Sequence, residues 1–187
     1  MPALAWILII VAVVVIVAIV AWLLMAKRRT GRLQERFGPE YDRAVREGDG
    51  RRGAERELTE REKRREKLDI RPLSPEAGQR YAESWRDAQA HFVDHPSQAV
   101  GEADALVTDV MRERGYPMED FTQRSADVSV DHPGVVDNYR AAHGISMANQ
   151  HDQATTEDLR QAMVHYRALF DELLGGDAGA DRRRDVG

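Results

Sequence analysis

Histidines are the residues whose type and spacing come nearest to a chemical site. All six of them lie between positions 91 and 165: His91, His95, His132, His143, His151 and His165. His91 and His95 are four positions apart, the spacing at which two imidazoles on one helix face can hold a metal ion. However, His95 precedes a proline, which disfavours helical backbone there. We therefore predict no metal site, and surface or capping roles for the histidines. A pH-responsive domain is the alternative, because histidines titrate near neutrality.

Two of these histidines belong to a repeated tetrapeptide. The sequence V-D-H-P occurs at positions 93–96 and again at 130–133. Aspartate can accept backbone N–H bonds at a helix start, and proline is favoured in the first helical turn. Each copy therefore predicts the start of a helix. The flanking residues match too weakly to indicate a duplicated hairpin.

Other catalytic patterns are missing from the sequence. The chain has no cysteine, which excludes disulfides and thiol chemistry. It also lacks a phosphate-binding loop, a G-x-S-x-G turn, a dinucleotide fingerprint and an H-E-x-x-H pair. Carboxylates are plentiful, but they fall where solvated helix faces would put them. The sequence thus predicts no catalytic residue and no cofactor.

Amphipathic helices are the elements that must position these side chains. The expected helices begin at Ser74-Pro75, Pro96, Met118, near Pro133 and at Thr155, and the last stops at Gly175-Gly176. No window alternates convincingly between apolar and polar residues, so we expect no sheet. The prediction is an all-α protein whose region 74–175 is an acidic bundle of four to five helices. The tail at 176–187 is expected to be disordered.

The first 26 residues carry no charged side chain. As a helix, the apolar run from Ala3 to Met25 would reach about 34 Å, enough to cross a hydrocarbon core of about 30 Å. We therefore predict a transmembrane helix at 1–26. A cleaved signal peptide is the alternative, but it would have a basic start and a shorter apolar core. An uncleaved signal-anchor fits the sequence better.

The flanks of this run predict its orientation. Basic residues follow the run and none precedes it, which places the C-terminal side in the cytoplasm. The expected interfacial residues of the anchor are Trp6, Trp22, Lys27, Arg28, Arg29 and Arg32. The predicted location is the plasma membrane, in a single pass with the N-terminus outside. The lipid bilayer is then one partner.

Charge separates the rest of the chain into two zones. Positions 27–71 hold 16 basic and 11 acidic residues, whereas positions 72–175 hold 8 basic and 18 acidic residues. Region 27–73 has no heptad seam, so we predict a charged stalk, either a solvated helix or a partly disordered linker. The acidic domain would repel phosphate, which predicts no nucleic-acid partner.

Three short segments carry a resemblance to known sequences. They are R-F-G-P-E-Y-D at 36–42, R-G-Y-P at 114–117 and S-V-D-H-P at 129–133, all behind the apolar N-terminus. With them, the chain resembles a group of uncharacterised small single-span membrane proteins from high-GC Gram-positive bacteria. The resemblance implies a bacterial plasma membrane and brings no activity or ligand.

These patterns predict a binding module as the function. The expectation is a membrane-anchored cytosolic helical domain that acts as a protein-interaction or scaffold module. Its partner contact would be an exposed aromatic side chain, Trp85 or Tyr116. A tethered domain that uses its histidines for metal binding or catalysis is the alternative. A third interpretation is a domain that only spaces or organises the membrane surface.

Overall fold

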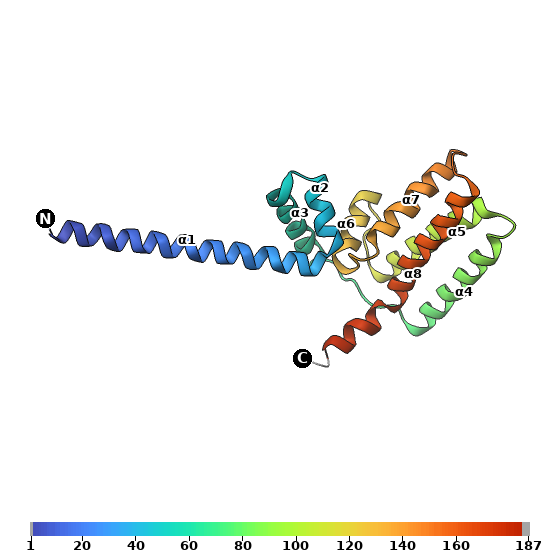
Figure 1. Ribbon diagram of the computed structural model, residues 1–187. Helices are drawn as coiled ribbons and strands as arrows, with labels where there is room; N and C mark the ends of the chain where they lie inside the picture. Colours follow the sequence, from blue (N-terminus) through green and yellow to red (C-terminus); the bar gives the residue numbers. More distant parts are fainter. Residues whose placement is uncertain (1, 185–187) are drawn as a thin grey trace. The chain divides into compact units, whose positions relative to one another are not determined.

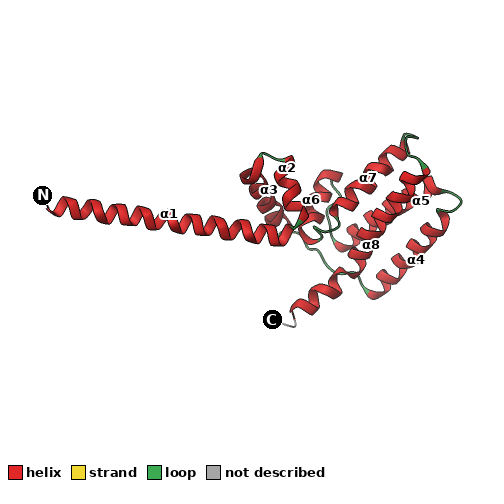
Figure 2. Ribbon diagram, in the orientation of Figure 1, coloured by secondary structure: helices red, strands yellow, loops and turns green. Residues whose placement is uncertain are grey.

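The computed structural model describes the backbone of residues 2–184 and the side chains of residues 13–25 and 27–175. Over this part of the chain every regular element is a helix, as predicted (Figures 1 and 2). The helices are α1 (Pro2–Phe37), α2 (Pro39–Glu47), α3 (Gly50–Arg65), α4 (Pro75–His91), α5 (Pro96–Arg114), α6 (Phe121–Asp131), α7 (Val136–Gln150) and α8 (Thr156–Arg184). The chain divides into two compact units, Met1–Leu58 and Thr59–Gly187, and the boundary between them falls in the sequence of α3.

The predicted transmembrane helix is contradicted. No helix of the described residues is both long enough and apolar enough to cross a membrane. The signal-anchor, the single-pass plasma-membrane location and the outward N-terminus depended on that span, so they are corrected with it.

The structure places the described side chains among the residues expected at the membrane interface on α1. Trp22 is 61% exposed on α1. Lys27, Arg28, Arg29 and Arg32 are exposed on the same helix, and the side chain of Trp6 lies outside the described residues.

The first unit has a small core of its own. Gly38, with φ +47°, separates α1 from α2, and Pro39 occupies the first turn of α2. A glycine followed by a proline interrupts a helix in this way. The buried apolar residues of this unit are Leu33, Phe37, Tyr41, Ala44, Ala54 and Leu58. This part of the charged region predicted as a stalk is thus helical and buries apolar side chains.

Local signals place the first two helices of the second unit where the sequence predicted them. The Ser74 hydroxyl accepts a hydrogen bond from the Ala77 amide at 3.1 Å, and Pro75 opens α4. Gly115 follows α5 in the left-handed conformation, with φ +96°. A Cβ atom there would lie 2.3 Å from the Asp69 carbonyl oxygen, so only glycine fits. This close approach holds the linker before α4 against the end of α5.

Helices α4, α5, α7 and α8 pack around the main apolar core. The Trp85 ring stacks on Phe170 with 4.8 Å between centroids. Both aromatics proposed as partner contacts are buried, Trp85 at 5% and Tyr116 at 3% exposure. Their expected exposure is therefore wrong. Trp85 lies on the apolar stripe of α4, and a stripe of that spacing is normally the core-facing side of a helix.

Helix boundaries differ from expectation in the second half of the unit. The Asp120 carboxylate accepts a hydrogen bond from the Gln123 amide at 2.9 Å, and α6 begins at Phe121 rather than Met118. The second V-D-H-P segment ends α6, and α7 begins only at Val136. Helix α8 continues through Gly175 to Arg184, because a glycine inside a helix costs only about 1 kcal/mol.

Candidate functional site: an arginine clasp on α6

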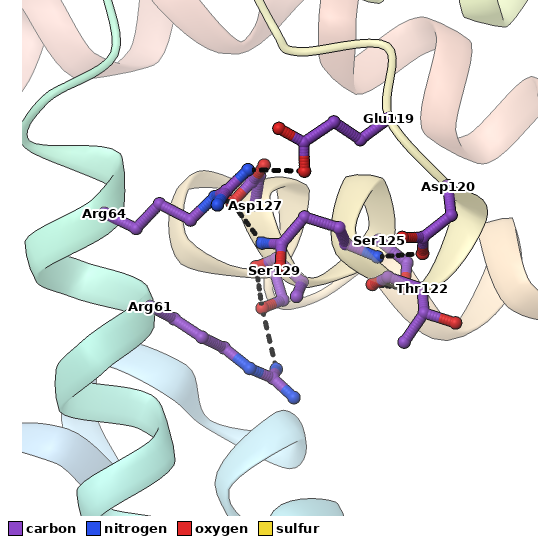
Figure 3. Close-up of polar contacts among 10 residues, drawn as sticks. Arg61, Arg64, Glu119, Asp120, Thr122, Ser125, Asp127 and Ser129 are labelled. Atoms are coloured by element: carbon purple, nitrogen blue, oxygen red, sulfur yellow. Dashed lines mark hydrogen bonds and ion pairs between the residues drawn. The ribbon is translucent and has the colours of Figure 1, made fainter.

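The last turns of α3 carry the polar contacts of the second unit that join the most distant parts of its chain (Figure 3). We call this cluster the arginine clasp. It consists of Arg61, Arg64 and Arg65 from α3, Glu119 from the segment before α6, and Asp127, Ser129 and Asp131 from α6. The arginines stand at positions i, i+3 and i+4, so they share one face of their helix. Partners 55 to 68 positions away in sequence face them.

Arg64 is the central residue of the clasp. Its Nε donates to Asp127 Oδ1 at 3.0 Å, and its Nη2 donates to Glu119 Oε2 at 2.9 Å. One planar guanidinium thus bridges two carboxylates through separate N–H groups, which lysine could not reproduce with the same geometry. In Figure 3 the Arg64 side chain extends from α3 toward both acids.

Asp127 is the most deeply buried acid of the clasp. Its residue exposure is 0%, and Oδ1 accepts a second hydrogen bond from Gln123 Nε2 at 3.0 Å. Burial raises the pKa of Asp127, while Gln123 and Arg64 act in the opposite direction by favouring the charged form. Oδ2 is also buried and accepts no hydrogen bond from the described residues. The site therefore keeps a buried acceptor that α3 leaves unused.

Asp131 connects two different segments to α6. Its Oδ2 accepts hydrogen bonds from Arg65 Nε at 2.5 Å and from the Tyr116 hydroxyl at 3.0 Å. Burial, together with the negative charge of Asp131, raises the pKa of Tyr116, so this phenol stays a hydrogen-bond donor. Asp131 thus fixes both the end of α3 and the segment after α5.

Arg61 completes the clasp through a neutral acceptor. Its Nη1 donates to Ser129 Oγ at 3.0 Å, and this hydroxyl in turn donates to the Ala126 carbonyl oxygen at 2.6 Å. The Ser129 hydroxyl is thereby oriented with a lone pair toward α3. Because Ser129 is 0% exposed, its position is set by the packing of α6.

A second polar cluster lies beside the core and joins α5, α7 and α8. The Tyr166 hydroxyl donates to Asp104 Oδ1 at 2.5 Å, and His143 Nδ1 lies 3.6 Å from the same oxygen. Burial raises the pKa of Asp104, but the nearby His143 ring and the hydrogen bond from Tyr166 outweigh it and leave the pKa lowered. The His143 ring stacks on Phe121 with 3.8 Å between centroids. These contacts fix three helices relative to one another, which is a structural role.

The structure separates the six histidines rather than gathering them. His91 Nδ1 lies 3.0 Å from Glu102 and its ring meets His95 edge-on at 5.6 Å. The other four have partners of their own: Glu172 at 3.3 Å for His132, Asp104 for His143, the Met147 carbonyl for His151 and Asn138 for His165. Within the described part of the chain, no group of three or more His, Asp or Glu side chains could hold a metal ion.

His132 stands at the C-cap of α6, but it departs from the expected surface position. It is 6% exposed, and burial lowers its pKa, although hydrogen bonding to Glu172 favours the charged form. The sequence carried one signal for this difference, since Val128 and Val130 precede His132 and both are apolar. Local sequence gave no comparable signal for the clasp, because its acids lie far from its arginines along the chain.

Fold and site together define an all-helical bundle with a basic helix end held on an acidic helix. Comparisons with protein-family models, curated proteins and solved structures find no match for this chain. A functional assignment therefore has to be argued from the geometry of the site.

Proposed function

We propose that this chain is a helical protein-interaction module whose binding surface is the α6 side of the second unit. The observation that carries the proposal is the arginine clasp. There, α6 and the segment before it hold a separate helix through guanidinium–carboxylate contacts. Arginine is enriched at protein–protein interfaces, where its planar group pairs with carboxylates in a defined geometry. The same chemistry would recognise a partner.

The two acids that contact Arg64 on this surface differ in exposure, and therefore in what they contribute to binding. Glu119 has a side chain that is 57% exposed, and exposed ion pairs contribute about 0–1 kcal/mol. Asp127 is 1% exposed at its side chain, so its charge needs a well-placed counter-charge. A contact of this kind is selective without being permanent, which suits a scaffold.

Long-range charge also favours a basic partner. Positions 72–175 hold 18 acidic and 8 basic residues, so the bundle carries a strong negative field. Such a field speeds association with a positively charged surface and repels an acidic one. The basic end of α3 fits this rule within the chain itself.

Affinity capture with matched charge reversals tests the proposal. The tagged full-length chain is cross-linked in its native extract, and each captured protein is confirmed by the reciprocal capture. We expect Glu119→Lys to weaken the capture and Glu83→Lys to preserve it. Glu83 is an exposed acid on α4 with a 68% exposed side chain, so both variants change the charge equally. Identical capture by both variants would contradict a binding surface at α6.

A further inference from the structure

We infer that the end of α3 is a replaceable ligand of α6. A partner helix with arginines at positions i, i+3 and i+4 takes the place of Arg61, Arg64 and Arg65. This inference rests on the proposed function, and it names the class of partner that the α6 surface selects. The chain then contains both a docking site and the segment that occupies it until such a partner arrives.

Each of the three arginines of the clasp has its own acceptor, and this division defines the recognition pattern. Arg61 meets a hydroxyl, Arg64 meets two carboxylates and Arg65 meets one carboxylate. Three of the four acceptors also make hydrogen bonds outside α3, with Ala126, Gln123 and Tyr116. Because these contacts do not involve α3, these three acceptors keep their arrangement when α3 leaves.

The buried Asp127 carboxylate shows that α3 does not use the whole site. Oδ2 of Asp127 is shielded from solvent and accepts no hydrogen bond among the described residues. A buried acceptor without a hydrogen bond destabilises the state that contains it. A partner with one further donor near its central arginine would recover part of this energy, so it can compete with α3.

The apolar attachment of this region lies in the linker rather than in the arginine face. Ile70 and Leu73 pack against the main core, and the Arg71 amide donates to the Arg114 carbonyl oxygen at 2.9 Å. The linker therefore stays in place when the clasp opens. A short tether of this kind keeps the end of α3 at an effective concentration of the order of millimolar. A partner must compete against that concentration.

Peptide exchange on the full-length chain tests whether the end of α3 is replaceable. The probe is a fluorescent peptide of residues 54–68, and the opened chain carries Arg61→Gln, Arg64→Gln and Arg65→Gln. We expect the peptide to bind the opened chain at least about tenfold more tightly than the wild-type chain, because the tethered competitor has been removed. Equal affinity for the two chains would overturn the inference.

Peptide variants test the role of arginine itself. Replacing the three arginines by lysine should weaken binding several-fold, since lysine lacks the planar fork. Replacing them by glutamine should abolish binding. A glutamine peptide that binds as well as the arginine peptide would overturn the inference, because it would show an attachment independent of the clasp.

Substitutions in the opened chain test the role of the acceptor carboxylates. Asp127→Asn should reduce peptide affinity at least about tenfold, as expected when one partner of a buried charge pair is lost. Circular dichroism checks that the fold is retained. If this variant unfolds, the exposed substitution Glu119→Gln replaces it and should weaken binding by a smaller factor. Unchanged affinity in a folded variant would overturn the inference.

The two proposals can fail separately. A captured protein that depends on Glu119 but displays no arginine helix would leave the interaction module standing and overturn the partner class. Peptide exchange without any captured protein in the native extract would support the partner class and contradict the interaction role.

Discussion

The two V-D-H-P segments share four residues but little of their surroundings. In the segment at 93–96, Val93 is 81% exposed and the chain turns from α4 into α5. In the segment at 130–133, Val130 is 3% and His132 6% exposed, and Asp131 holds both Arg65 and Tyr116. Identical side chains thus acquire different energetic roles from the elements that contact them. The second copy forms part of the arginine clasp, and the first lies at the edge of a hairpin.

The valines of the two segments should differ most in their contribution to stability, because Val130 is buried and Val93 is exposed. Val130→Ala is expected to lower the free energy of unfolding by about 2 kcal/mol, because it removes buried methyl groups. Val93→Ala should change it by less than about 0.5 kcal/mol, as is usual for an exposed site. Urea unfolding of the full-length chain, followed by circular dichroism, measures both. Equal effects would show that the two segments have similar surroundings.

The aspartates of the two segments should differ less in their contribution to stability than the valines do. Asp131→Ala removes the acceptor of Arg65 and of the Tyr116 hydroxyl, so we expect a loss of about 1–2 kcal/mol in unfolding free energy. Asp94→Ala is the matched substitution at an exposed position and should cost less than about 0.5 kcal/mol. The same urea experiment compares them. A loss at Asp94 as large as that at Asp131 would contradict the assignment of the clasp to the second copy.

The histidine of the second segment should make stability depend on pH. Burial lowers the pKa of His132 in the folded chain, and the positive charge of Arg114 acts in the same direction. Glu172 and Asp131 act in the opposite direction, because they favour the charged form of His132. The unfolded state then binds protons first, so stability is complete above the ordinary value of about 6.5 and falls as the pH drops below it. His132→Gln should flatten this loss, because glutamine does not titrate. Urea midpoints between pH 5 and 8 measure the effect. A wild-type chain with a flat profile over this range would contradict the prediction.

Local sequence signals were enough to locate several elements. Ser74-Pro75 and Gly115 mark the start of α4 and the end of α5, because capping and left-handed backbone depend on neighbouring residues. The same reasoning failed at the second V-D-H-P segment, where tertiary contacts let the tetrapeptide end α6 instead of opening α7. It also failed at 1–26, where composition alone predicted a membrane span that the described helices do not provide.

Local sequence patterns could not predict the candidate site. Nearest-neighbour rules assign Arg64 to a glutamate on its own helix, whereas the structure pairs it with Asp127, 63 positions away. The separate charges of the two zones indicated only that attraction between them was favourable. Burial of Tyr116 and His132 likewise depends on elements that are distant in sequence. Such contacts are set by the packing of the whole unit.

A double-mutant cycle on Arg64 and Asp127 tests most directly whether the clasp is a specific contact. Lys63 and Glu60 form the matched control, an ion pair of 2.7 Å on the same helix with 58% and 65% exposed side chains. We predict a coupling energy of about 1–3 kcal/mol for Arg64 with Asp127, as for contacting residues in a network. The control pair should give about 0.5 kcal/mol or less, as exposed helix pairs do. A coupling between Arg64 and Asp127 no larger than that of the control pair would contradict the account.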